Sequence, residues 1–322
     1  SRPTLPDPAY NPSRSEMLAA ASAIASLCTA AGLRVICLEP FLHYPGLLPL
    51  SARDHRLYAE DELPLWFEMS DLLGTDLIQV ASTMFAVNPS TGETVATGDE
   101  SRVVEDLRML AEQGLAWGRR SSSGRTKYFA YEAMCFGAFV TTWQQAWRQV
   151  QLVDRPNFGL VLDTFQILGG SIVDPSLPGG LIDGWRSKLA DELRELAQAF
   201  GGEHNEEARG KLFFCQLGDA QMPLDGSVLD RNSPLFDPKV HANPKMAWSR
   251  SFRMYASEGI MREASVPLSQ LIFRDAKQGG IGYRGWVSAE YFNTDTGSDD
   301  PLYPFLSAER CSAGHEWTME QL

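Results

Sequence analysis

Cysteine is scarce in this chain, and no two cysteines form a CxxC pair. The five cysteines are Cys28, Cys37, Cys135, Cys215 and Cys311, and four of them lie in apolar runs. A disulfide scaffold needs an even number of cysteines, and a zinc cluster needs closely spaced cysteines. Both kinds of structure are therefore disfavoured. We expect buried, reduced thiols in a cytoplasmic protein. Cys135 and Cys215 have no adjacent histidine, which argues against a nucleophilic role for either of them.

Long hydrophobic runs and basic residues are also in short supply. No apolar run approaches the roughly twenty residues that a membrane span needs. The polar, proline-rich start shows no signal peptide, and because it lacks a methionine we expect a truncated or partly observed chain. With 28 basic and 41 acidic residues, the net charge is −13, which disfavours nucleic acid and membranes as partners. A small-molecule substrate is the expected partner, and a homo-oligomer stays open.

Strands and helices are predicted to alternate along the chain. Apolar runs predict six strands, at 33–38, 76–80, 127–131, 157–162, 212–217 and 285–289. Amphipathic or alanine-rich stretches predict helices between them, at 16–31, 54–73, 99–114, 142–153, 185–200, 248–255 and 266–277. Alternation of this kind is typical of a parallel sheet.

The number of strands and the missing motifs narrow the fold further. No predicted strand is followed by a GxGxxG motif, because the match at 280–285 precedes the last predicted strand, and the chain has no P-loop, GxSxG or HxxxH motif. A dinucleotide-binding fold is therefore disfavoured. Six strands are too few to close a (β/α)8 barrel, and we interpret the chain as a TIM barrel whose first two strands lie before Ser1 or have been lost. A chain of 322 residues suits one such α/β domain. Within it we expect an approach segment at 1–15, an active-site loop at 222–247 and a polar tail at 293–322.

Four successive strands end on oxygen-bearing side chains, namely Glu132, Asp163, Gln216 and Glu290. The carboxyl ends of parallel strands meet at one edge of the sheet, where α/β proteins build their sites. Three carboxylates there would repel one another unless a cation lay among them. Hard oxygen ligands favour Mg²⁺, Mn²⁺, Co²⁺ or a similar divalent ion. The alternative is that each acid only caps the following helix or pairs with a basic residue.

Other side chains are candidates for binding and proton transfer. His43 follows a predicted strand by a few residues and is suited to proton transfer near neutral pH, although a packing role is equally compatible with its aromatic loop. Arg250 follows the predicted active-site loop and could bind a substrate carboxylate, or form a surface ion pair. Gln79, on a predicted strand, is a candidate for substrate binding, and Trp248 and Phe292 could line the pocket or belong to the core.

Several segments resemble the fungal 3-dehydroshikimate dehydratases of the xylose isomerase-like TIM-barrel superfamily. The longest is YEAMCFGAFVTTWQQAWRQVQLVDRPNFGLVLDTFQILGG, and the others are ICLEPFLHYPGL, LGTDLIQVAS, the WSR of AWSRSFRMY, and GWVSAEYF. The resemblance extends from about Arg34 to Phe292. It implies a divalent metal held by Glu132, Asp163, Gln216 and Glu290, and two further strands at the start of the barrel.

The reaction that the resemblance implies is the dehydration of 3-dehydroshikimate to protocatechuate through a metal-stabilised enolate. The implied roles are a metal ligand at the reacting centre for Glu132, proton transfer for His43 and binding of the substrate carboxylate for Arg250. Aromatisation would drive the loss of water.

The chain departs from this family at several positions. Glu39 replaces an expected glutamine in LEPF, and Gln166 lies where some relatives have a histidine. Gln221 replaces an acid, and the loop from Pro223 to Pro244 looks different from the family's. We therefore predict a retained metal site with an altered substrate pocket.

The sequence predicts a metal-dependent carbon–oxygen lyase, and two other classes of function stay open. A sugar or polyol isomerase or epimerase, or an enzyme of specialised metabolism, could use the same metal and barrel. A degenerate barrel that acts only as a binding partner would hold no metal tightly.

Overall fold

The computed structural model describes residues 12–42, 44–48 and 57–322 of the chain. His43 and residues 49–56 lie outside the described part. Among the described residues, no helix is both long and apolar enough to cross a membrane.

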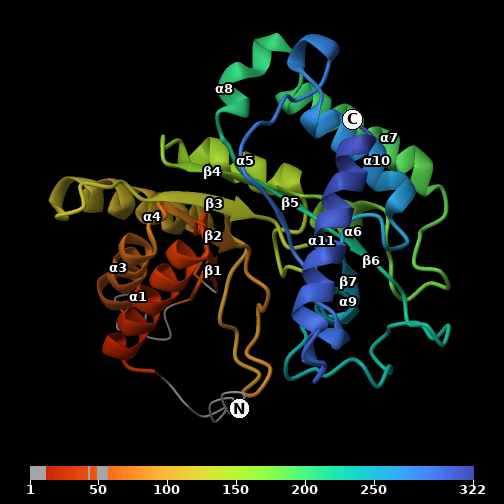
Figure 1. Ribbon diagram of the computed structural model, residues 1–322, viewed down its shortest axis with the longest axis horizontal. Coiled ribbons are helices and arrows are strands. Elements are labelled where there is room, and N and C mark those ends of the chain that lie inside the picture. Colours follow the sequence, from red (N-terminus) through yellow and green to blue (C-terminus); the bar gives the residue numbers. More distant parts are fainter. Residues whose placement is uncertain (1–11, 43, 49–56) are drawn as a thin grey trace.

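A six-stranded parallel sheet forms the centre of the molecule (Figure 1). Its order is β1-β2-β3-β4-β5-β8, so neighbours in space follow the order of the chain. The strands are β1 (Leu38–Phe41), β2 (Leu77–Ala81), β3 (Tyr128–Glu132), β4 (Phe158–Asp163), β5 (Leu212–Leu217) and β8 (Val287–Ala289). A short antiparallel pair, β6 (Asp219–Ala220) and β7 (Arg253–Met254), lies beyond β5.

The central strand β4 shows why the sheet forms from this sequence. All six of its residues are buried, as expected for a parallel strand that is covered on both faces. Leu160 and Leu162 belong to the large core between the sheet and the helices. Val161 packs on the inner face with Ala130 and Phe214. Successive side chains thus alternate between the two faces, and Asp163 follows Val161 on the inner face.

Helices cover the outer face of the sheet (Figure 1). The helix α4 packs on β3, α5 packs on β3 and β4, and α6 packs on β4 and β5. The α-helices are α1 (Arg14–Ala30), α3 (Leu63–Leu73), α4 (Glu100–Arg120), α5 (Trp143–Val153), α6 (Thr164–Ser171), α7 (Trp185–Phe200), α8 (Glu206–Arg209), α9 (Pro244–Phe252), α10 (Arg262–Phe273) and α11 (Tyr303–Glu320). Shorter turns are η1 (Leu57–Glu62), η2 (Glu203–Asn205), η3 (Ala276–Gln278) and η4 (Thr294–Gly297).

All six predicted strands are present, but the bounds of some elements differ from prediction. The first strand lies later than expected, because its ladder with β2 begins only at Leu38, opposite Ile78. The helix expected at 248–255 begins earlier, since Asn243 caps it and Pro244 occupies its first turn. Residues 221–243 form no helix or strand, in keeping with the predicted loop.

The C-terminal segment is more ordered than the predicted polar tail, because it contains the helix α11. Arg310 of this helix lies over the rings of Tyr255 and Tyr291, 5.4 and 5.1 Å from their centroids. Its Nε and Nη2 donate to the two carboxylate oxygens of Glu258, each at 2.8 Å. The two tyrosines stack with centroids 4.4 Å apart. Arg310 therefore holds α11 against the segments that follow β7 and β8.

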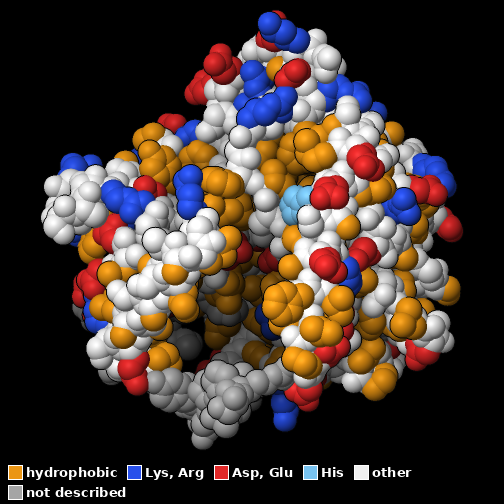
Figure 2. All heavy atoms as spheres, in the orientation of Figure 1, with side chains coloured by type: hydrophobic (Ala, Val, Ile, Leu, Met, Phe, Trp, Pro, Cys, Tyr) orange, Lys and Arg blue, Asp and Glu red, His pale blue; other side chains and the backbone are white. Residues whose placement is uncertain are grey.

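In Figure 2, the face in view is hollowed between the side with α1 and α3 and the side with α11.

We predict that Arg310→Ala lowers the free energy of unfolding by about 1–2 kcal/mol, because it removes a bidentate ion pair and two ring contacts. Denaturant unfolding followed by circular dichroism would measure the change. Arg194→Ala is the control, since Arg194 pairs only with Asp191 and both side chains are exposed. An equal, small effect of the two variants would contradict this role for Arg310.

Candidate metal centre

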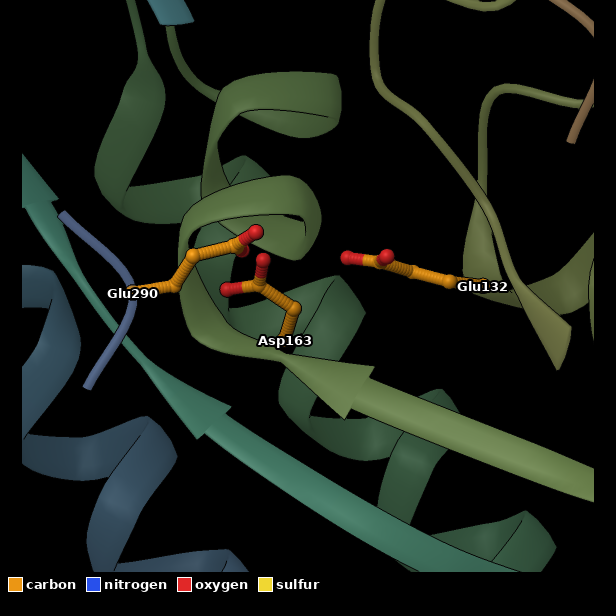
Figure 3. Close-up of side chains that lie close together, drawn as sticks. All are labelled: Glu132, Asp163 and Glu290. Atoms are coloured by element: carbon orange, nitrogen blue, oxygen red, sulfur yellow. The ribbon is translucent and has the colours of Figure 1, made fainter. Parts of the chain in front are cut away.

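Three carboxylates converge at the carboxyl edge of the sheet (Figure 3). Glu132 ends β3, Asp163 ends β4, and Glu290 follows β8 directly. One oxygen from each lies within 4.8 Å of the others. The prediction that these strand ends meet is confirmed by the described residues.

The three carboxylates are largely removed from water, which makes their charges costly. Glu132 and Asp163 are each 1% exposed. Burial and the charges of Glu290 and Asp163 raise the pKa of Glu132 well above its usual range. Burial also raises the pKa of Glu290, although Arg253 opposes that shift. A cation among these oxygens would stabilise the charged forms.

Arg253 is the basic residue that the structure places in this centre, and the sequence analysis did not single it out. Its side chain is buried, and its Nη2 lies 2.5 Å from Asp163 Oδ2 and 2.9 Å from Glu290 Oε2. Its Nε donates to the backbone oxygen of Glu290 at 2.9 Å. The guanidinium also lies 4.4 Å from the ring centroid of Phe165. Burial alone would lower the pKa of Arg253, but Asp163 and Glu290 raise it, so the side chain stays charged.

Helix capping and ion pairing, the alternatives to metal binding, are found for two of the three carboxylates. Asp163 does cap α6, since its Oδ1 accepts from the Phe165 N–H at 2.8 Å, and it also pairs with Arg253. Glu290 pairs with Arg253 as well. In the described chain Glu132 has no basic partner, and its hydrogen bond comes from the Gln79 amide. Capping and ion pairing therefore leave Glu132 without compensation for its charge.

Two buried glutamines complete the ring of polar groups. Gln216 lies beside Asp163 in the register of β4 and β5, as predicted. Gln79 Nε2 donates to Glu132 and, at 3.2 Å, to Gln216 Oε1. Gln79, predicted to contact the substrate, thus lies against two predicted ligands and orients them.

Several buried polar atoms of this ring have no hydrogen-bond partner in the described structure. Three of them are oxygens, Gln79 Oε1, Glu132 Oε1 and Ser288 Oγ, and the fourth is the nitrogen Gln216 Nε2. Unpaired buried oxygens are rare in folded proteins, and here they border the carboxylate cluster. Such oxygens are suitable ligands for a hard divalent cation, so the residues present fit a metal of this type.

The remaining predicted site residues have different surroundings. Arg250 is exposed on α9 and forms no ion pair with described residues; its Nη2 lies 4.0 Å from Met84 Sδ. Phe292 is 46% exposed. Trp248, in contrast, is fully buried and stacks on Phe165 at 4.6 Å, so it supports Phe165 from behind and does not line an open pocket. His43 lies outside the described residues.

Glu39 is a further carboxylate on the inner face of the sheet. Leu38 pairs with Ile78 on the helix-covered face, so the next residue, Glu39, shares the inner face with Gln79. Partial desolvation and the charge of Glu290 raise the pKa of Glu39 to about 7. The unexpected acid in LEPF was the signal in the sequence, and the register of β1 shows where it points.

Gln166, the other notable departure, has a structural role. Its Oε1 accepts from the Cys135 N–H at 2.8 Å, and its side chain is buried. It therefore fixes the segment that follows Glu132, a role that needs no proton transfer.

The chain is similar to known proteins over most of its length. A family model described as xylose isomerase-like TIM barrel matches residues 4–247. A 3-dehydroshikimate dehydratase of Neurospora crassa is 33% identical over 287 residues, which cover 89% of this chain and 72% of that protein. A 3-dehydroshikimate dehydratase of Pseudomonas aeruginosa is 30% identical over 268 residues, covering 83% of this chain but only 31% of that protein.

A solved structure supports the fold. The IolI protein, described with a bound zinc atom, aligns with a TM-score of 0.55 at 17% identity, over 93% of this chain and 80% of that chain. At this identity the likeness concerns the fold alone. The TIM-barrel fold predicted from the sequence is thus confirmed, as is the resemblance to a fungal dehydratase.

We predict that Glu132→Gln weakens Mn²⁺ binding at least about tenfold, because it removes the negative charge of a proposed ligand. Isothermal titration of the chelator-treated protein would measure this. Affinity in the unchanged protein should also rise with pH, since the raised pKa values of Glu132 and Glu290 mean that the cation competes with protons.

The matched control is Glu112→Gln, which changes an exposed carboxylate paired with Arg155. It should leave Mn²⁺ affinity unchanged. Equal affinity of Glu132→Gln and the unchanged protein would contradict the assignment of this metal centre.

Proposed function

Because the chain belongs to the xylose isomerase-like TIM-barrel family, we propose that it is a metal-dependent carbon–oxygen lyase that dehydrates 3-dehydroshikimate to protocatechuate. The observation that carries this proposal is the convergence of Glu132, Asp163 and Glu290 at the carboxyl edge of the sheet. The names of the Neurospora and Pseudomonas relatives supply the substrate.

The proposed cofactor is Mg²⁺, Mn²⁺ or Co²⁺, held by Glu132, Asp163, Gln216 and Glu290. When bound, a divalent ion supplies a positive centre that polarises the substrate ketone and offsets the charge left when the adjacent proton is removed. The chain's own residues preorganise this centre. Gln79 orients Glu132 and Gln216, and Arg253 holds Asp163 and Glu290.

We propose Arg250 and Phe292 for substrate binding and His43 for proton transfer. The guanidinium of Arg250 is exposed and has no acidic partner in the described chain, so it is available to a substrate carboxylate. Phe292 offers an exposed ring at the end of β8. His43 remains the sequence-based candidate for proton transfer. The product of the reaction is one water and an aromatic acid, which accounts for all atoms of the substrate.

The remaining proposals concern the domain organisation and the cellular location of the enzyme. We propose a single TIM-barrel domain over residues 1–322. The loop predicted at 222–247, whose last four residues belong to α9, is proposed to lie beside the site. Cytoplasmic localisation is also a proposal, supported by the free thiols of the described cysteines.

Glu39 favours one alternative function. A further negative charge on the inner face would repel an anionic substrate such as 3-dehydroshikimate, but it would not repel an uncharged keto sugar or polyol. An isomerase or epimerase that uses the same metal is therefore the second candidate.

We predict that the purified protein forms protocatechuate from 3-dehydroshikimate when Mg²⁺, Mn²⁺ or Co²⁺ is present, and that chelation abolishes this activity. The catechol absorbance would report the product. Glu132→Ala should lower the rate by roughly a thousandfold or more, because the centre would lose a ligand. Retained metal with no product would contradict the proposed substrate and favour the keto-sugar alternative.

We predict that Glu39→Gln lowers the KM for 3-dehydroshikimate by about threefold to tenfold, because it removes repulsion between two carboxylates at the partly screened mouth of the site. Steady-state kinetics at fixed metal concentration would measure the effect. The kcat should change little, since Glu39 does not belong to the proposed ligand set. A large loss of kcat would instead make Glu39 a proton-transfer residue.

A further inference from the structure

We infer that Arg253 sets the charge of the metal centre so that the site selects divalent over trivalent cations. The inference rests on the proposed metal-dependent function, since it concerns the ion that the centre takes. The ligand set alone does not determine whether a divalent or a trivalent ion binds more tightly.

Arg253 is a fixed part of the centre. Its guanidinium is buried and makes three polar contacts, to Asp163 Oδ2, Glu290 Oε2 and the Glu290 backbone oxygen. The Phe165 ring lies against it, and Trp248 stacks on Phe165 with an interplanar angle of 27°. The backbone of Arg253 is held as well, since its N–H donates to the Phe292 oxygen at 2.9 Å. These contacts come from two separate segments, 163–165 and 290–292, and Trp248 supports one of them, so we expect the charge to stay in place when an ion binds.

The formal charges around the centre show what this residue does. Glu132, Asp163 and Glu290 contribute three negative charges, and Arg253 contributes one positive charge, which leaves a net charge of −2. A divalent ion brings the buried centre to neutrality. Without Arg253 the net charge would be −3, which a trivalent ion would neutralise. Glu39 lies outside the cluster of three carboxylates and is unchanged in every variant below, so it does not alter the comparison.

A purely positioning role for Arg253 makes a different prediction. If the side chain only orients Asp163 and Glu290, its loss should weaken the binding of every cation by a similar factor. If its charge matters, its loss should change the ratio of trivalent to divalent affinity, because Coulomb energy scales with ion charge. The ratio therefore separates the two roles, even where overall affinity falls.

The experiment measures the Kd of Mn²⁺ and of Tb³⁺ for the purified chain by titration at one pH. We expect Arg253→Met to shift the ratio of the two constants toward Tb³⁺ by at least about tenfold. Arg253→Lys, which keeps the charge but loses the planar fork, should keep the ratio within about threefold. Arg194→Met, which removes an exposed arginine of α7 that pairs with Asp191, is the control and should leave the ratio unchanged.

Two further variants, Glu290→Gln and its combination with Arg253→Met, test the inference if Arg253→Met alone does not fold. Glu290→Gln should shift the ratio toward Mn²⁺ by at least about tenfold, because the net charge of the centre changes from −2 to −1. Adding Arg253→Met to Glu290→Gln returns the net charge to −2 and should restore the original ratio. Equal ratios in all these variants, or the same shift in Arg253→Lys as in Arg253→Met, would overturn the inference. Failure of the unchanged protein to bind either ion would instead overturn the proposed metal centre.

Discussion

Repulsion among three buried carboxylates is the constraint on which the rest of this structure depends. Glu132, Asp163 and Glu290 each lie at the end of a parallel strand, so the geometry of the sheet brings their charges within a few ångströms of one another. Water does not screen Glu132 and Asp163, which are almost fully buried. The fold can keep such a cluster only if positive charge and hydrogen-bond donors surround it.

The elements around the sheet supply part of that compensation. Arg253 reaches two of the carboxylates from β7, and β7 is tied to β6 by an antiparallel ladder. Asp219, at the start of β6, accepts N–H groups from Ala220, Gly259 and Met261, and so fixes the chain beyond β7. Arg310 of α11 then clamps Tyr255 and Tyr291, which lie two residues after Arg253 and one after Glu290. Segments far apart in the sequence thus cooperate to place one guanidinium.

The resemblance to the dehydratases is fuller at the proposed metal ligands than at the residues around them. The four strand-end positions of the proposed ligands keep the residue types that the dehydratase resemblance implies. Glu39 and Gln166 lie within the same region and differ from it. Gln166 has become a structural residue that holds Cys135, whereas Glu39 adds negative charge to the inner face. A barrel of this kind can keep the chemistry of its centre while its substrate preference changes, because the ligands lie on strands and the selecting residues lie mostly on loops.

The sequence by itself determined the alternation of strands and helices, the parallel sheet and the carboxylates at its edge. Each of these follows from local pattern: strand 157–162 is a continuous apolar run, and the acid that follows must lie at the carboxyl edge. Only the tertiary structure decided the identity of the basic partner, since Arg253 lies 90 residues from Asp163 and no local pattern separates it from Arg250. The same holds for Trp248, whose burial behind Phe165 depends on how α9 packs. The helix α11 escaped prediction because its apolar residues, such as Phe305 and Leu306, do not form a buried stripe. Periodicity records which face of an element is buried, whereas contacts between distant elements depend on packing that no single segment encodes.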